Sequence, residues 1–145
     1  MRIQNASVSG DTTAGGRARL GWALADKPDY LLLELGANDA LRGTDPRETR
    51  ANLDAILAEL KSKGIKALML GMLAPPNFGK AYGEAFNAIY PDLAKQYGVP
   101  LYPFFLDGVA LDTRLNQPDR LHPNPQGVAI LVERVGPVVK RWLKA

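Results

Sequence analysis

Short apolar runs that alternate with helical patterns are the feature that most constrains the fold of this chain. Residues 30–35 form a mostly apolar run bounded by proline and glycine, as expected for a parallel strand buried on both faces. Residues 65–70 and 99–104 form two further runs, and Arg2–Val8 is a fourth, shorter strand candidate. This alternation predicts an α/β domain in which a parallel sheet carries helices on both faces.

Capping residues indicate where helices begin between these strands. Thr12 or Thr13 can cap a helix that runs to about residue 26, and Asp45 can cap a second helix. A third helix is expected from about residue 81 to 97, interrupted or restarted at Pro91, and Asn124 can cap a last helix to about residue 143. The second helix has one apolar face, formed by Leu53, Ile56, Leu57 and Leu60.

Length and composition exclude several classes of protein. The 145 residues fit a single domain that is large enough for a hydrophobic core. No cysteine and one histidine exclude disulfides and thiol nucleophiles and argue against a zinc site, so we expect neither a metal nor another cofactor. Scattered lysines and arginines give a net charge of +3, a weak basis for nucleic-acid binding. No apolar run approaches the ~20 residues that span a bilayer, and no signal peptide is evident.

The only histidine of the chain lies three residues after an aspartate, in the segment Asp119–Asn124. Asp119 can hold one ring nitrogen of His122, which leaves the other nitrogen free to take a proton from a hydroxyl nucleophile. The alternative is a loop histidine beside a solvated aspartate, and a motif this short does not decide between the two.

Polar clusters follow three of the expected strands. Ser9–Asp11 follows the first strand, Gly36–Asp39 follows the second, and the loop with Asp119 and His122 follows the last. Open α/β sheets bind their ligands beyond the carboxyl ends of the strands. Taken separately, a glycine here can simply make a tight turn and an asparagine can make an Asx-turn. Their common position at one edge of the sheet favours a functional site.

Together these segments resemble the SGNH (GDSL) hydrolases, specifically the bacterial arylesterase, thioesterase I and lysophospholipase L1 group. Residues 5–12 resemble the second conserved block of that family, 34–43 the third and 119–124 the fifth. The stretches 76–91 and 99–105 also match the group, so the resemblance covers essentially the whole chain. It implies the flavodoxin-like fold of the SGNH hydrolases and hydrolysis of a small acyl or aryl ester or thioester.

The resemblance also implies a role for individual residues. Gly10, through its backbone N–H, and Asn38, through its side-chain amide, would form the oxyanion hole, because donors held there stabilise charge that develops in the transition state. His122 would be the general base and Asp119 its orienting partner. Six neighbouring residues would contact the substrate: Asp39, Leu41, Arg42, Pro75, Pro76 and Phe78.

One family feature does not occur in this sequence. The family carries its nucleophilic serine in a Gly-Asp-Ser-Leu block at the end of its first strand, whereas the serines here are Ser7, Ser9 and Ser62. Gly10–Gly15 looks superficially like that block with threonine for serine. Its flanks belong to the second block, however, and it lies too close to residues 36–39. We therefore expect a chain that starts near the family's second strand, without the first strand, the first helix or a nucleophile.

Three functions are compatible with this interpretation. The esterase chemistry can belong to the full-length protein, so that this chain is inactive or weakly active; the chain can be a non-catalytic remnant that binds an acyl ligand; or it can be a self-associating form of the fold. Without an inner strand, Arg2–Val8 must either slide inward to pair with residues 30–35 or leave a slot. Uncovered strand edges favour association, so we expect a homo-oligomer, most simply a dimer.

Overall fold

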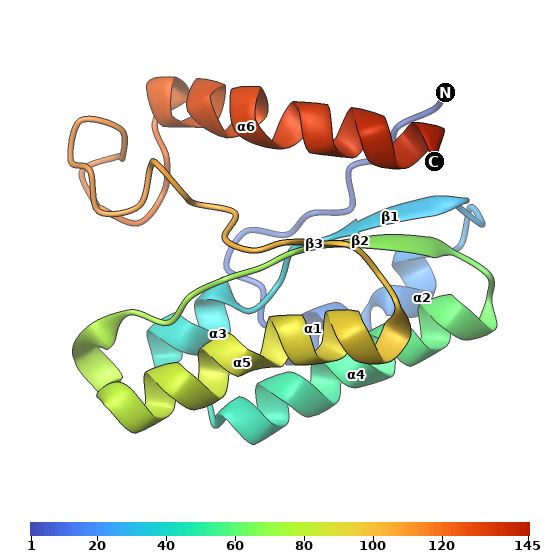
Figure 1. The fold of residues 1–145 in the computed structure, drawn as a ribbon, viewed down its shortest axis with the longest axis horizontal. Coiled ribbons are helices and arrows are strands. Elements are labelled where there is room, and N and C mark those ends of the chain that lie inside the picture. The colour runs from blue at the N-terminus through green and yellow to red at the C-terminus, as the bar shows by residue number, and fades with distance from the viewer.

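Three short parallel strands form the sheet at the centre of the computed structural model, which describes residues 1–145 (Figure 1). They are β1 (Tyr30–Leu33), β2 (Lys66–Leu70) and β3 (Leu101–Tyr102), in the order β1-β2-β3. Both pairings are parallel, with Leu31 opposite Ala67 and Met69 opposite Leu101. The predicted α/β class with a parallel sheet is therefore confirmed.

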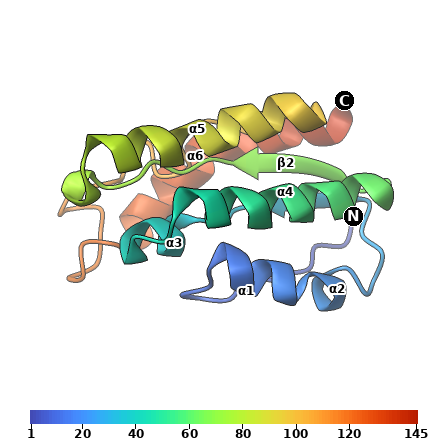
Figure 2. The same ribbon diagram turned by 90° about the horizontal axis from the view of Figure 1, so that it is seen from below.

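Helices cover both faces of this sheet. In Figure 1, α6 lies above the sheet and the other long helices lie below it, and Figure 2 shows α1 and α2 beneath α4. The helices are α1 (Thr13–Ala18), α2 (Leu20–Ala23), α3 (Ala37–Arg42), α4 (Pro46–Ser62), α5 (Lys80–Tyr97) and α6 (Pro125–Lys144), with a short 3-10 helix η1 (Pro76–Phe78). No helix is both long enough and apolar enough to cross a membrane.

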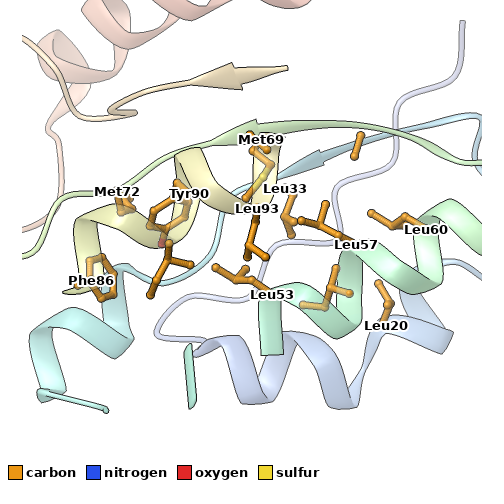
Figure 3. Close-up of a cluster of buried hydrophobic side chains, with 14 of the residues drawn as sticks. Leu20, Leu33, Leu53, Leu57, Leu60, Met69, Met72, Phe86, Tyr90 and Leu93 are labelled. Carbon is orange, nitrogen blue, oxygen red and sulfur yellow. The ribbon is translucent and has the colours of Figure 1, made fainter. Parts of the chain in front are cut away.

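The main hydrophobic core lies between the sheet and the helices α4 and α5 (Figure 3). The predicted apolar face of α4 is at most 2% exposed, which confirms the helix and its orientation. A smaller cluster of Leu68, Leu70 and Val135 lies between the sheet and α6. The ring of Trp142 on α6 packs edge-on against Tyr30 of β1, 5.2 Å between centroids. The face of the sheet towards α4 and α5 is thus packed against many more buried side chains than the face towards α6.

Helix starts follow the capping prediction more closely than helix ends. The Thr12 hydroxyl accepts a hydrogen bond from the Gly15 N–H at 3.1 Å, and Asn124 accepts one from Gly127 at 3.0 Å. The first helix does not run to residue 26: it breaks at Arg19, and α2 ends at Ala23. Its three glycines account for the break, because glycine is a poor helix former. The expected interruption at Pro91 is absent, since α5 is continuous and anchored by the buried residues around it.

The strand predicted at Arg2–Val8 is wrong. This segment pairs with no strand and is almost entirely exposed, so β1 keeps a free edge. The strand expected at 99–104 is reduced to two residues because the flanking Pro100 and Pro103 have no N–H to donate. The backbone contact continues beyond it nevertheless: Gly71 donates to the Tyr102 carbonyl at 2.7 Å and accepts from Phe105 at 2.8 Å.

Candidate active site

Asp119 and His122 form a hydrogen-bonded pair in the loop that leads into α6. His122 Nδ1 lies 2.6 Å from Asp119 Oδ2, the contact expected from the sequence. The other carboxylate oxygen accepts the backbone N–H groups of Leu121 and His122 at 2.9 and 3.0 Å. The bond to His122 and these two backbone bonds lower the pKa of Asp119 to about 2. Asp119 is therefore ionised at neutral pH and accepts a hydrogen bond from Nδ1–H of His122.

This arrangement leaves Nε2 of His122 without a protein partner. The side chains of His122 and Asp119 are 60% and 42% exposed, so the free nitrogen faces solvent. The loop itself is held by its backbone: Gln117 donates to the His122 carbonyl at 2.7 Å, and Asn124 donates to the Leu115 carbonyl at 2.9 Å. The amide of Asn116, which is buried, bonds two further carbonyls of the same loop. A local network thus holds the imidazole ring with one nitrogen exposed.

Gly10 and Asn38 lie side by side although 28 positions separate them in the sequence. The Asn38 amide donates to the Asp11 carbonyl at 3.0 Å, which places α3 against the turn that contains Gly10. Only one of the two N–H bonds of this amide is used there. Gly10 has φ +77°, and nothing lies within 4 Å of the position a Cβ would take. The space beside Gly10 is therefore open, and Asn38 retains one N–H without a protein partner.

A tyrosine that the sequence analysis did not identify supports the start of α3. Tyr90 on α5 donates its hydroxyl to the Leu35 carbonyl at 2.8 Å. Gly36, which follows, has φ +113°, and a Cβ there would collide with the Tyr90 hydroxyl. Burial raises the pKa of Tyr90, so the hydroxyl keeps its proton and remains a donor. Nothing in the sequence distinguishes Tyr90 from a core residue of an amphipathic helix.

Asp39, expected to contact substrate, is instead an internal anchor. It is 1% exposed and not accessible to a ligand. Its carboxylate accepts the backbone N–H of Thr13 at 2.8 Å and the hydroxyls of Thr13 and Thr49 at 2.5 and 2.9 Å. These bonds tie α3 to α1 and α4. The sequence did not reveal this role because adjacent helical residues point in different directions, Asn38 towards the turn and Asp39 into the protein.

The other residues expected near the substrate remain at the surface. Leu41 and Phe78 are each 41% exposed, Arg42 and Pro76 are exposed, and Pro75 is half-buried. The Phe78 ring lies beside Gly43, at the end of α3, where a Cβ would come within 2.7 Å of it. It also packs against Tyr82, 5.2 Å between centroids. The loop that contains η1 and the end of α3 therefore form one apolar surface.

The two halves of the site lie at the same end of the sheet. In Figures 1 and 2, α3 and the loop before α6 both lie beyond the carboxyl ends of the strands. No hydrogen bond joins His122 to Gly10, Asn38 or any serine; the Ser62 hydroxyl donates to Glu59 at the end of α4. The Asp119–His122 pair and the Gly10–Asn38 pair thus lie at the edge where open α/β sheets bind their ligands.

The chain belongs to the GDSL-like lipase/acylhydrolase family, whose model matches residues 1–130. It is 44% identical to the esterase TesA of Pseudomonas aeruginosa over 143 residues, which cover 98% of this chain and 71% of that protein. It is 46% identical to thioesterase 1/protease 1/lysophospholipase L1 of Escherichia coli K12 over 123 residues, which cover 84% of this chain and 59% of that protein.

A crystal structure of TesA matches with a TM-score of 0.89 at 42% identity, covering 97% of this chain and 78% of that one. This similarity confirms the SGNH hydrolase fold that the sequence resemblance implies. The chain spans between 59 and 71% of the length of the two curated relatives.

Proposed function

We propose that residues 1–145 form a single domain with the oxyanion-binding and acid–base parts of a site for ester or thioester hydrolysis. The observation that supports this most directly is the 2.6 Å contact between His122 Nδ1 and ionised Asp119, with Nε2 exposed. The similarity to proteins named as an esterase and a thioesterase favours the same chemistry.

In this mechanism Nε2 of His122 takes a proton from an attacking water molecule as the water oxygen bonds to the acyl carbon. The carbonyl oxygen becomes an oxyanion, which accepts the Gly10 N–H and the spare N–H of Asn38. The intermediate collapses, the bond to the leaving alcohol or thiol breaks, and His122 returns its proton to the leaving group. Asp119 stays ionised and stabilises the imidazolium through Nδ1–H.

An apolar acyl or aryl group would rest on the surface formed by Leu41, Pro75, Pro76 and Phe78. The position of Phe78 against the end of α3 supports this assignment. Arg42 is exposed beside it and donates to the Gly10 carbonyl at 3.2 Å, so it contributes to the rim of the site rather than to its apolar part.

None of the three serines forms a hydrogen bond with His122, so we infer slow or absent turnover for residues 1–145. Oxyanion donors and binding alone accelerate hydrolysis roughly 10³–10⁴-fold over water in serine proteases without their triad. Hydrolysis of p-nitrophenyl butyrate tests this. We expect a rate not far above that order. His122→Ala should remove the part that needs a general base and leave the part that comes from the oxyanion donors and binding. Asp92→Ala, a change at a surface ion pair, should leave the whole rate unchanged.

Robust turnover that Ser9→Ala abolishes would identify Ser9 as the nucleophile and contradict the proposal. The main alternative is a non-catalytic domain that binds an acyl ligand. Stabilisation of the chain by octanoate, without turnover of the ester, would favour that alternative.

The free edge of β1 supports a homodimer. Leu32 in the middle of β1 is 47% exposed, and Val128 and Val132 on α6 are 48% and 64% exposed. An unpaired edge with apolar neighbours favours pairing with another chain. We expect light scattering at low micromolar concentration to give the mass of a dimer, and Leu32→Lys to give a monomer. Leu111→Lys, in a loop residue that is already 87% exposed, is the control. A monomeric parent chain would rule the dimer out.

A further inference from the structure

The turn that contains Gly10 is not positioned by a strand. In a parallel sheet, a loop beyond a strand takes its position from the strand's hydrogen bonds, and residues 1–8 make no such bonds. Within the turn, the only backbone hydrogen bond runs from the Asp11 N–H to the Val8 carbonyl, at 3.2 Å. Side chains from elsewhere must therefore hold Gly10 beside Asn38.

Arg19, at the junction between α1 and α2, bonds both ends of this turn. Its Nε donates to Asp11 Oδ2 at 2.5 Å, and its Nη1 donates to the Ala6 carbonyl at 2.5 Å. The side chains of Arg19 and Asp11 are 26% and 13% exposed, whereas Arg2 and Asp26 in another ion pair are 82% and 51% exposed. Shielding from water makes the Arg19 bonds stronger than those of a typical surface pair.

The shape of α1 allows this contact. A Cβ on Gly15 would collide with the Asp11 carboxylate, and a Cβ on Gly16 would collide with Leu35, two residues beyond the end of β1. The two glycines therefore let α1 fit closely between the Gly10 turn and β1. Only glycine fits at both positions. This explains why α1 contains two adjacent glycines although glycine weakens a helix.

We propose that Arg19 is a positioning residue that holds the Gly10 turn in place of strand pairing. It acts from one side of the turn, while Asn38 acts from the other through its bond to the Asp11 carbonyl. The link to oxyanion binding rests on the proposed function, but the position of the turn is measurable without it. Arg19 itself does not contact a substrate.

Backbone order parameters from NMR test the positioning. We expect values of about 0.85 at Gly10 and Asp11 in the parent chain and below about 0.6 in Arg19→Met, as for a flexible loop. Arg17→Met is the matched control, because Arg17 lies two residues before Arg19, in α1, and makes one exposed 3.4 Å contact with Asn52. Order parameters in β2 should stay near 0.85 in every variant, which shows that the fold is intact.

Arg19→Lys keeps the charge but offers a single ammonium for two acceptors, so we expect intermediate order at Gly10. It also replaces Arg19→Met as the test if the latter unfolds. A turn that is equally rigid in Arg19→Met and Arg17→Met would overturn the proposal. So would a turn that is already flexible in the parent, or one that Arg19→Lys leaves fully ordered.

Titration with octanoate tests the link to the oxyanion site, with the Gly10 amide signal as the probe. We expect affinity to fall about tenfold in Arg19→Met, the loss typical of one charge-assisted hydrogen bond, and to be unchanged in Arg17→Met. Equal affinity in the parent and Arg19→Met would overturn the link. If the parent does not bind octanoate while the order parameters fall as expected, the proposed function fails and the positioning role stands.

Discussion

The two halves of the candidate site are built in opposite ways. The Asp119–His122 half is local: one loop supplies the acid, the base and the backbone groups that hold them. The Gly10–Asn38 half is composite, because it depends on a turn after residues 1–8, on α3, and on side chains from α1, α4 and α5. The Asp119–His122 half should therefore keep its geometry when other parts of the fold change. The Gly10–Asn38 half should lose its geometry when any supporting element moves.

Removal of Asp39 is the strongest test of this difference. Asp39→Ala leaves the hydroxyls of Thr13 and Thr49 and the Thr13 N–H without their buried acceptor. We expect urea unfolding to show that the free energy of unfolding falls by about 3 kcal/mol. The variant loses hydrogen bonds to a charged group and leaves their buried partners unsatisfied, and both effects are destabilising. Asp92→Ala, at an exposed ion pair with Arg50, should change stability by less than about 0.5 kcal/mol. Equal effects of the two variants would contradict the anchoring role.

A second test compares two glycines. Gly36→Ala introduces a side chain at φ +113° and against the Tyr90 hydroxyl, so we expect about 2 kcal/mol of destabilisation. Gly21→Ala lies in α2 with open space around it, and should stabilise the chain by about 0.5–1 kcal/mol. Thermal unfolding of both variants measures the difference. A neutral Gly36→Ala would mean that the turn before α3 relaxes without cost.

Tyr90→Phe removes only the hydroxyl that holds the Leu35 carbonyl. The ring stays in the core beside Phe86, so only one hydrogen bond is lost. We expect the free energy of unfolding to fall by about 1 kcal/mol. The Asn38 side-chain amide should shift in the NMR spectrum, since α3 loses a support, while the His122 ring signals should not. A shift at His122 of similar size would show that the two halves are coupled.

The smallest expected effect concerns the local half. The pKa of Asp119 is lowered, so its contact with His122 is fully present above the ordinary aspartate pKa and is lost as the pH falls through about 2. Carbon NMR of the Asp119 carboxyl should give a midpoint near pH 2 in the parent. In His122→Ala the midpoint should rise but stay below the ordinary value of about 3.9, because two backbone N–H groups still bind the carboxylate. No rise would mean that His122 is not its main partner.

Sequence reasoning succeeded where the determinants are close in the chain. The contact between Asp119 and His122 spans three positions, and the caps at Thr12, Asp45 and Asn124 satisfy N–H groups two or three residues away. The apolar face of α4 was equally predictable because its spacing follows from helix geometry.

It failed where the partner is remote. Arg2–Val8 has the composition of a strand, but composition does not show whether a strand pairs, and this segment leaves the free edge of β1 unpaired. The direction of Asp39 depends on how α3 begins at Gly36, which in turn depends on Tyr90, 54 positions later. The role of Arg19 likewise appears only when Ala6 and Asp11 are seen to flank its guanidinium.

The thin attachment of α6 has a consequence for motion. Only Gly127, Leu131 and Val135 of its 20 residues are buried, whereas α4 and α5 each bury five. Segments with few buried contacts open at a lower free energy than the whole domain unfolds. In native-state hydrogen exchange we therefore expect α6 to exchange by sub-global opening while β2 and α4 exchange only on complete unfolding. The histidine that precedes α6 is thus attached to a unit that opens separately, whereas Asn38 lies on α3, which Asp39 ties to α4 in the most stable part of the fold.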